Sequence, residues 1–428
     1  MNIIERGKRF VQSLQELVGR AVWQWRDCPH CGSTHTCRNG SYTRHPWYFD
    51  GRRAVRVQRH LCHDCGRTYS EQSALLVRGS WYGREVHRWA IDHWLHAGSS
   101  LRRTAEWLRS QMGHQERWRL WRPWDEEDGR ERCYLAASTV HRWLDGAGRQ
   151  AERSIEGQLE GVPISRQLGC DGLWARLRGG GKRVVLLVVD SVSGVIWPPV
   201  VAKGEESADD WAPLFERARR AGLPLQALRG VTSDGSQGLM AYLRQQLHWV
   251  NHQRCVWHLW RGLSGPLLRA GRQAATGLVG KAARAARQQA RREVAGLVRA
   301  VFDAASYQQA EEALSLLRAH PLGQELWPLV AEQMNAALVH LLSYNHRLVR
   351  VAPEWCWRDF RLRLSRGRNH ASDERLERAS LLWAIYHDFE PAQRRSERKR
   401  KYRRPGQSPF ARAGVRPGKV SYLDALCV

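Results

Sequence analysis

The sequence is short of acidic residues and contains no long apolar run. It has 42 Asp and Glu against 68 Lys and Arg, which gives a formal net charge of +26. A soluble protein this basic needs a polyanionic partner, and nucleic acid is the usual one. A preference for Arg over Lys in the genome would explain which basic residue is used, but it would not explain the excess over acids.

Apolar segments that would direct the chain into or across a membrane are also missing. No stretch approaches the roughly 18–20 consecutive apolar residues of a membrane span. The segment Met1–Arg9 is charged and lacks the apolar core of a signal peptide. We therefore expect a cytoplasmic protein. Its 428 residues are enough for several domains and at least one sizeable core.

Ten cysteines in a chain of this length do not indicate a disulfide scaffold. Four of them form two Cys-x-x-Cys pairs, Cys28/Cys31 and Cys62/Cys65, each followed by Gly. A β-type segment between the pairs predicts a zinc ribbon over residues 28–75, with four thiolates closing a structural Zn²⁺ site. A redox role is the alternative, but it leaves the two pairs and their glycines unexplained. The spare donors, of which one could replace a cysteine, are His30, Cys37, His60 and His63.

Helices are expected on either side of this ribbon, over residues 1–27 and 80–150. In the second stretch, Leu101, Ala105 and Leu108 share one face, and a later helix is expected to start with Ser138 as its N-cap. The two helices are similar to a helix-turn-helix in which His141 and Arg142 are exposed for DNA contact. A long insert, about Gly113 to Leu135, replaces the usual short turn. A generic helical bundle is the alternative.

Residues 165–262 are expected to form strands and helices in alternation. Predicted strands cover 183–190, 195–201 and 225–232, and predicted helices cover 207–220 and 238–247. Asp190 ends the most apolar strand, where Asp-Ser-Val-Ser-Gly favours a hairpin turn over a metal ligand. This order is typical of an α/β RNase H-like core. Residues 263–345 have a helical composition, which predicts an all-α insertion.

Three acids lie in contexts that favour a metal site. Asp171 and Asp234 end or follow short apolar strands, and Glu354 is expected to open a helix. Carboxylates from distant segments can together hold two Mg²⁺ ions. Two such ions activate one oxygen and stabilise another during phosphodiester cleavage or transfer.

Several motifs together resemble one family. They are Cys170-Asp-Gly172, Ser233-Asp-Gly-Ser-Gln-Gly-Leu239, Gln253-Arg-Cys-Val-Trp-His258, the run Glu354 to Arg363, and the C-terminal segments 386–393 and 402–409. With the ribbon, they resemble bacterial insertion-sequence transposases of the Mutator-like DDE group, in a zinc-ribbon subtype. The likeness runs over nearly the whole chain.

The resemblance implies a DNA transposase that binds the terminal inverted repeats of its element. It would cleave and transfer strands with Mg²⁺ or Mn²⁺ held by Asp171, Asp234 and Glu354. Synapsis of two DNA ends implies at least a homodimer, and the protein would lie with the bacterial nucleoid. The stretch Val349–Pro353 departs from the family's usual Thr or Ser with Asn, so Glu374 and Glu377 remain rivals for the third acid.

The same resemblance implies supporting residues near the acids. Cys255 and His258 lie one helical turn apart and would stand beside the active site, although a core Cys and a hydrogen-bonded His would give the same spacing. Arg358 and Arg361 follow the third acid at steps four and seven. Residues 346–390 would complete the core.

Two basic segments remain open in function. Lys281–Arg287 forms a basic helix face that is either solvated or in contact with DNA. The C-terminal segment 391–428 contains a run of basic residues, for which we favour phosphate contact over a disordered tail.

Two other functions remain possible for the whole chain. One is a sequence-specific DNA-binding regulator derived from a transposase, without catalysis. The other is a structure-selective nuclease on an RNase H-like core.

Overall fold

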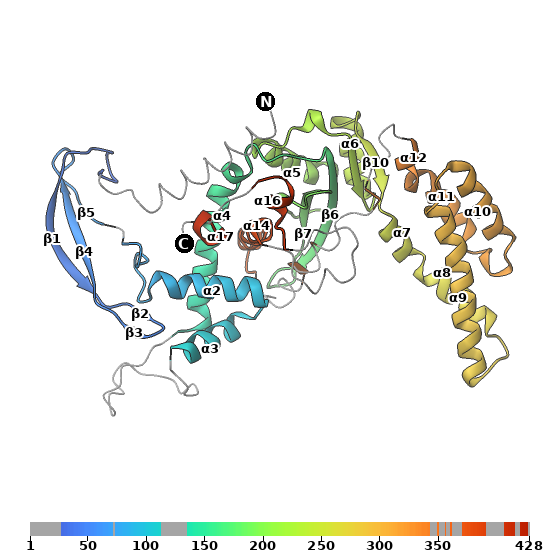
Figure 1. Cartoon of the computed structure of the whole chain (residues 1–428), viewed down its shortest axis with the longest axis horizontal. Coiled ribbons are helices and arrows are strands. Elements are labelled where there is room, and N and C mark those ends of the chain that lie inside the picture. Colours follow the sequence, from blue (N-terminus) through green and yellow to red (C-terminus); the bar gives the residue numbers. More distant parts are fainter. Residues whose placement is uncertain are drawn as a thin grey trace. The chain divides into compact units, whose positions relative to one another are not determined.

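The chain has a mixed α/β fold in two compact units, shown in the computed structural model of Figure 1. Unit 1 comprises Met1–Pro163, Arg176–Gly181 and Asp359–Val428, and unit 2 comprises Ile164–Ala175 and Lys182–Arg358. The structure describes residues 27–71, 73–112, 135–342, 349–350, 356, 360–361, 370–390, 406–415 and 420–426. The helix predicted over 1–27 and the tryptophan-containing insert at 113–134 lie outside these residues.

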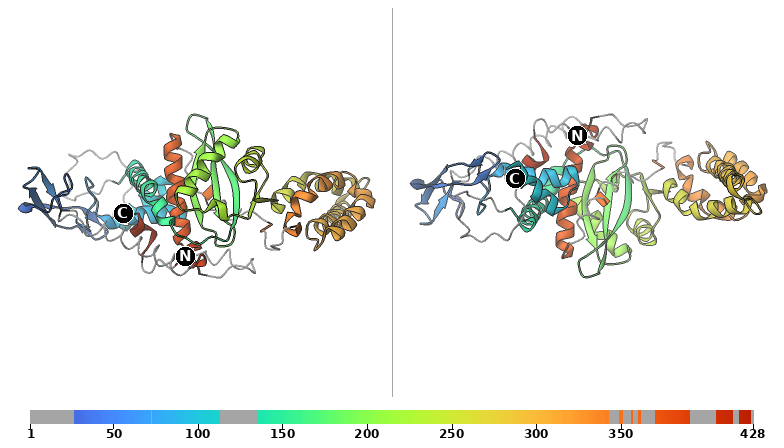
Figure 2. Two further views of the ribbon diagram at one scale, coloured as in Figure 1. Left: turned by 90° about the horizontal axis from the view of Figure 1, so that it is seen from above. Right: turned by 90° about the horizontal axis from the view of Figure 1, so that it is seen from below.

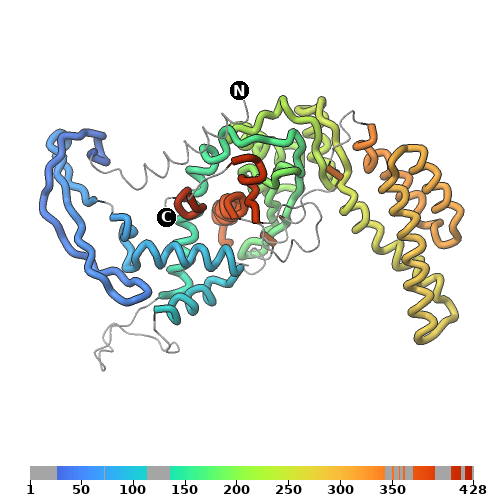
Figure 3. Tube along the Cα trace, viewed as in Figure 1, coloured from blue at the N-terminus to red at the C-terminus, as the bar shows by residue number. Residues whose placement is uncertain are grey.

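Unit 1 begins with an antiparallel ribbon, which can be followed along the blue tube in Figure 3. Its three-stranded sheet has the order β1-β4-β5, and a separate two-stranded hairpin pairs β2 with β3. The strands are β1 (Thr36–Arg44), β2 (Trp47–Tyr48), β3 (Gly51–Arg52), β4 (Val55–Cys62) and β5 (Thr68–Ser70). The hairpin is fixed to the segment that follows the ribbon, because the Trp47 N–H donates to Trp81 O and the Gly83 N–H donates to Trp47 O, both at 2.8 Å.

Helices make up the rest of unit 1. They are α2 (Arg84–Ala97), α3 (Leu101–Gln111), α4 (Ala137–Leu159), α14 (Asp373–Phe389), α16 (Pro409–Arg412) and α17 (Tyr422–Ala425). Helix α14 packs along α4, where a Cβ at Gly148 would lie 2.7 Å from the Cβ of Arg378. The stretch expected to complete the α/β core therefore contributes α14 to unit 1.

Unit 2 is built on a five-stranded sheet of order β10-β9-β6-β7-β8, which Figure 2 shows from two sides. The strands are β6 (Gln167–Arg176), β7 (Lys182–Asp190), β8 (Ile196–Ala202), β9 (Gly230–Ser233) and β10 (Asn251–Arg254). Strand β9 runs parallel to both β6 and β10, whereas β7 and β8 are antiparallel. Strand β8, which contains two prolines, lies at a sheet edge as predicted.

The connections in this sheet follow the expected turn and cap chemistry. Ser207 and Asp210 form a capping box at the start of α5 (Ala208–Arg220), as its predicted N-cap requires. Asp190 is buried and accepts hydrogen bonds from the hydroxyls of Ser165 and Ser193, both at 2.8 Å. It therefore holds the β7–β8 turn, and the prediction of a turn is confirmed.

Two details of the predicted core are wrong. The strand expected over 225–232 begins only at Gly230, because Leu225–Ala227 forms a 3₁₀ turn in which the Ala227 N–H donates to Pro224 O. Strand β10 was not predicted at all, since Asn-His-Gln-Arg has no apolar pattern. Helix α6 (Gln237–Gln246) lies between β9 and β10, close to its predicted place.

The described part of the insertion consists of helices joined by short turns, as its composition predicts. It contains α7 (Val256–Gly262), α8 (Ser264–Ala274), α9 (Gly280–Phe302), α10 (Tyr307–Ala319), α11 (Trp327–Ala337) and α12 (Val339–Leu342). These helices bury a separate apolar cluster that includes Val294, Val298, Phe302, Leu317 and Val330. Gln253 ties the cluster to the sheet, since its amide donates to Ala337 O at 2.6 Å and its carbonyl accepts from the His340 N–H at 2.9 Å.

No helix that the structure describes is both long and apolar enough to cross a membrane.

Candidate functional site

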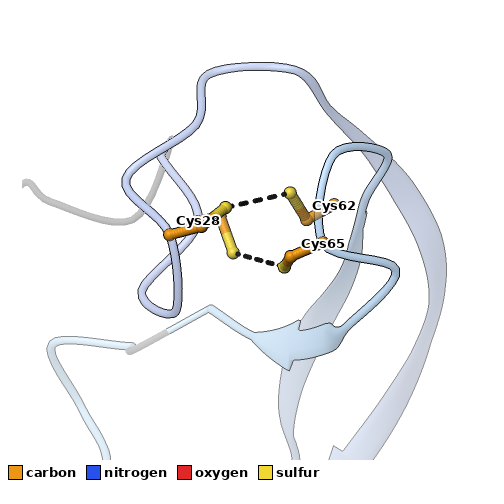
Figure 4. A group of neighbouring side chains, drawn as sticks. Cys28, Cys62 and Cys65 are labelled. Carbon is orange, nitrogen blue, oxygen red and sulfur yellow. Dashed lines mark hydrogen bonds between the residues drawn. The ribbon is translucent and has the colours of Figure 1, made fainter.

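The two Cys-x-x-Cys pairs meet at one end of the ribbon. The sulfurs of Cys28, Cys31, Cys62 and Cys65 lie within 4.8 Å of one another. Cys28 Sγ is 3.5 Å from Cys65 Sγ, and Cys31 Sγ is 3.6 Å from Cys62 Sγ. Figure 4 shows Cys28 facing Cys62 and Cys65 across the gap between two turns. This prediction of a common four-cysteine site is confirmed.

Each pair lies on a tight turn that a glycine closes. The Gly32 N–H donates to Cys28 O at 2.8 Å, and the Gly66 N–H donates to Cys62 O at 3.0 Å. Both glycines have a positive φ, 75° and 67°, which a residue with a Cβ rarely adopts. The glycines therefore let both turns present their two sulfurs on the same side.

The donor set fits a zinc ion. In a tetrahedral site with Zn–S bonds of about 2.3 Å, neighbouring sulfurs lie about 3.8 Å apart, close to the separations found here. Burial raises the pKa of the Cys28 thiol, but hydrogen bonds from the backbone at His30 and Cys31, together with those from the Cys65 and Cys31 side chains, outweigh it and bring this pKa to about 7. The cluster could therefore bind zinc, and among the described residues none of the spare donors His30, Cys37, His60 and His63 joins it.

Asp171 and Asp234 lie level with each other in unit 2. The parallel register pairs Leu168 with Val231 and Gly169 with Thr232. These pairs end two residues before the acids; continued by two residues, the register would set Asp171 beside Asp234, and neighbouring chains in a sheet run about 4.8 Å apart. Asp171 is buried, with 9% of its surface exposed. Burial raises the pKa of the Cys170 thiol, and the negative charges of Asp171 and Asp234 raise it further.

The turn after β9 fixes Asp234 at the start of α6. Asp234 Oδ1 accepts from the Ser236 N–H at 3.0 Å, and the Ser233 hydroxyl accepts from the Gly235 N–H at 2.9 Å. Gly235 has φ +78°, and a Cβ there would overlap the guanidinium of Arg254. The positive charge of Arg254 thus lies over the turn that carries Asp234.

A third buried carboxyl, Glu206, lies beside these acids and was missed in the sequence. A Cβ at Gly172 would overlap Glu206 Oε1, and a Cβ at Gly238 would overlap the Glu206 carbonyl oxygen. Burial raises the pKa of Glu206, and the charge of Asp234 raises it further, against hydrogen bonds from Trp174 and Ser236. The carboxyl therefore connects the strand that carries Asp171 with the turn that carries Asp234.

Glu206 adopts a backbone conformation that L-residues avoid. Its φ is +60°, and only one other non-glycine residue in the described chain, Arg166, has a positive φ. Such a conformation costs about 1–2 kcal/mol, so the surrounding contacts must hold it. The signal available in the sequence was small: an acid directly before the helix-capping Ser207, with glycines at 172 and 238 to receive it.

Asp171, Asp234 and Glu206 do not form a compact ligand cluster by themselves. Among the described residues, the four cysteines alone place three or more possible ligand atoms within 4.8 Å of one another. The carboxyls supply the oxygen ligands that Mg²⁺ prefers.

Glu354 and Arg358 lie outside the described residues, but the chain just before them is fixed to the sheet. The Val349 N–H donates to Gln167 Oε1 at 2.8 Å, and the Thr232 hydroxyl donates to Val349 O. One residue later, Arg350 O accepts from the Val256 N–H at 3.0 Å. Residues 349–350 therefore return to the strands that carry the first two acids.

The remaining candidates for the third-acid region fall in unit 1. Arg361 is exposed. Glu374 lies in the first turn of α14, 3.9 Å from the guanidinium of Arg378, and Glu377 lies on the same helix.

Cys255 and His258 lie at the start of α7, directly after β10. Cys255 is the N-cap residue and is buried, and its N–H donates to Ser233 O at 2.7 Å. His258 is half-buried one turn later. The pair therefore packs next to the residue that precedes Asp234.

His141 and Arg142 lie in the first turns of α4 in unit 1. Arg142 is exposed and donates to the Thr139 hydroxyl at 3.2 Å. His141 is half-buried, and burial followed by the charge of Arg375 lowers its pKa. The predicted Ser138 cap is wrong, because the N-cap residue is Ala136, which provides no side-chain cap.

Helix α9 carries a groove whose wall is rich in arginine. The groove has a volume of about 740 Å³ and is lined by Arg284, Arg287, Arg291, Arg292 and Arg299 together with small and apolar residues. No acidic side chain lines it within the described part of the chain. The basic face predicted at 281–287 is thus the beginning of a longer cationic surface.

The family comparison bears on unit 2. Residues 199–352 match the family model described as "Transposase, Mutator family". The matched segment includes Asp234, Cys255 and His258, whereas Asp171 and Glu354 lie outside it. A comparison with curated proteins gave no match. In agreement with the resemblance seen in the sequence, residues 199–352 are thus similar to transposases of the Mutator family.

Proposed function

We propose that this protein is a DNA transposase that binds the terminal inverted repeats of an insertion sequence and cleaves and transfers DNA strands. The observation that carries the proposal is the parallel register of β6 and β9, which runs toward Asp171 and Asp234. The Mutator-family match, which includes Asp234, supports this use of the two acids.

The arrangement of the sheet supports an RNase H-like core. Strand β6 is central, with the antiparallel pair β7 and β8 on one side and the parallel strands β9 and β10 on the other. In open α/β sheets, ligands bind beyond the carboxyl ends of parallel strands. Asp234 lies at this position, directly after β9.

In this mechanism Asp171, Asp234 and Glu354 would hold two divalent cations. Two Mg²⁺ or Mn²⁺ ions, when bound, supply charge stabilisation for the attacking and leaving oxygens of the phosphodiester. The Ser236 N–H holds one oxygen of Asp234, which orients the carboxylate. Gly172 and Gly235 let Glu206 and Arg254 approach closely, and Arg254 adds a positive charge beside the turn that carries Asp234.

The other regions then hold the DNA. The ribbon, with a structural Zn²⁺ on its four cysteines, and the helix-turn-helix-like pair α3 and α4 would bind the element's ends, with His141 and Arg142 toward the DNA. The arginine groove of α9 adds cations for phosphates. Because two ends must be joined, we propose that the active form is at least a homodimer.

The test is strand cleavage with Mg²⁺ on a labelled duplex that carries the DNA flanking this gene. Wild type is compared with Asp234→Asn, Glu354→Gln and the control Asp209→Asn, an exposed acid in the first turn of α5. We expect cleavage at the element boundary in wild type and control, and a loss of about 10³-fold in the other two.

Other outcomes would change the proposal. Cleavage lost in Asp234→Asn but retained in Glu354→Gln would move the third acid to Glu374 or Glu377. Cleavage retained in Asp234→Asn would refute the carboxylate mechanism. DNA binding without cleavage in every protein would favour the regulator, and cleavage that ignores the element's ends would favour a structure-selective nuclease.

A further inference from the structure

A second cavity lies in unit 1, within the helical region and the base of the ribbon. It has a volume of about 920 Å³ and is lined by the segment 77–84, by the hairpin residues Trp47 and Arg52, and by the first turns of α4. This volume is at the upper end of the range for small-ligand pockets, roughly 300–1,000 Å³. A single nucleotide fits such a space, whereas a DNA duplex does not.

The wall of this cavity is cationic. Five arginines line it: Arg52, Arg78, Arg84, Arg142 and Arg149. Arg149 forms an ion pair with Asp145, which does not line the cavity, and no acidic side chain does so among the residues described in unit 1. Guanidinium groups are suited to phosphate because they donate two parallel hydrogen bonds.

The first turn of α4 adds a second source of positive potential. Ala136, Ser138 and Thr139 line the cavity, and Ala136 offers no side-chain cap to the helix. The first N–H groups of a helix lack partners within it, and they favour an anion. Because α4 has 23 residues, its dipole is fully developed at this end.

Aromatic rings form the rest of the lining. Trp81 is 72% exposed, although its carbonyl is fixed by the hydrogen bond from Trp47. Trp143 stacks on His87 with ring centroids 3.9 Å apart and meets Tyr82 edge-on at 5.2 Å. Trp81 thus offers an uncovered indole face, while Trp143 is held in place by its neighbours.

His87 contributes a surface for stacking rather than a charge. Its Nε2 lies 2.7 Å from the Ser80 hydroxyl, and burial, with a smaller effect of Arg84, lowers its pKa to about 3. The imidazole therefore stays neutral at physiological pH, and the cations of the site are the arginines alone.

We propose that this cavity binds one unpaired nucleotide of DNA, with its phosphate between the arginines and the start of α4 and its base stacked on Trp81. The choice of DNA rests on the proposed transposase function. Arginines alone would suit the backbone of a duplex, but exposed aromatic rings beside them are typical of sites for single strands, where each base offers a ring face. The site would hold an end nucleotide that is frayed or flipped from the duplex.

The test uses a twelve-nucleotide single strand with one central 2-aminopurine and, separately, the same strand in a duplex. Stacking on Trp81 quenches 2-aminopurine, so binding and stacking are read together. We expect Trp81→Ala to weaken binding of the single strand about tenfold and to abolish the quenching. Trp81→Phe should retain most of both, and duplex affinity should change little. The matched control is Trp249→Ala, which removes another exposed tryptophan, in unit 2.

Arg142→Gln tests the phosphate contact in the same assay. For a single strand, the slope of log affinity against log salt should fall in magnitude by about 0.7 for one lost contact. Arg244→Gln, an exposed arginine of α6, is the control and should leave the slope unchanged.

The proposal is overturned if Trp81→Ala binds and quenches like wild type, or if it weakens the duplex as much as the single strand. It is also overturned if an RNA strand of the same sequence binds more tightly than DNA. Wild type that quenches 2-aminopurine but cleaves no DNA would support this site while refuting the transposase mechanism. DNA cleavage by wild type, together with no effect of Trp81→Ala on binding, would support the transposase mechanism while refuting this site.

Discussion

The four cysteines of the ribbon and the carboxyls of unit 2 gather possible metal ligands in different ways. The cysteines lie on two glycine-closed turns, and their sulfurs are already within 4.8 Å of one another. Asp171, Glu206 and Asp234 come from three elements, and what brings them together is strand register and two close glycine contacts. The cysteine site is thus set by two local turns, whereas the acid site is set by packing between segments that are distant in the sequence.

Removal of the metal should have the largest effect, and it should destabilise the ribbon without affecting unit 2. A strong chelator, or Cys62→Ser, should cost the ribbon on the order of 10 kcal/mol, because its small core cannot stabilise the fold without the ion. Zinc content by metal analysis and protease resistance of residues 28–71 measure this, and unit 2 should be unaffected. Cys37→Ser, outside the cluster, is the control. One zinc per chain retained in Cys62→Ser would contradict the assignment.

Acid should instead weaken the sheet. Burial, and then the charge of Arg254, lowers the pKa of His252 to about 4. Between about pH 4 and pH 6.5, the unfolded chain therefore binds a proton at His252 that the folded chain does not bind. The free energy of unfolding falls as the pH drops through this range, by up to about 3 kcal/mol. Urea unfolding across this range should show a shallower pH dependence for His252→Gln. The exposed His248→Gln should retain the wild-type slope.

A single added methyl group should disturb the acid site through its packing. In Gly238→Ala, the new Cβ meets the backbone of Glu206 and Ser207, so we expect a loss of about 2 kcal/mol. In Gly296→Ala, on α9, the Cβ meets nothing within 4 Å, and a gain of up to about 1 kcal/mol is expected. Chemical denaturation compares the two. Equal stability of both variants would show that the close approach at Gly238 is relaxed in solution.

The smallest effect is expected in the α9 groove, which contains no candidate metal ligand, and it concerns the salt dependence of DNA binding. If duplex DNA lies in the α9 groove, Arg284→Gln and Arg287→Gln together should flatten the salt dependence of binding by about 2 in slope. Arg269→Gln, on α8, removes an arginine already paired with Glu325 at 2.8 Å and is the control. Fluorescence anisotropy over a salt series measures the slopes. An unchanged slope in the double variant would show that this face of α9 is solvated and does not contact the DNA.

The sequence predicted best what neighbouring residues determine. Cys-x-x-Cys-Gly fixes a turn by itself, and Ser207 with Asp210 fixes a helix start, so both were predictable. Glu206 was not, because its place depends on Gly172 and Gly238, far away in the chain. Strand β10 is polar and, among the described strands, pairs with β9 alone, so no periodicity marked it. Ser138 was a reasonable cap by residue type, but the helix begins at Ala137, two residues earlier than such a cap allows.

The helical insertion leaves and rejoins the sheet at nearly the same point. The Val256 N–H, where the chain departs into α7, donates to Arg350 O, where it returns. A segment whose two ends meet at one hydrogen bond can change its length without straining its host. Residues 257–348 are therefore a natural place for exchange: a short linker joining 256 to 349 should leave the five-stranded sheet intact, and this point of the sheet can accommodate a segment of different length.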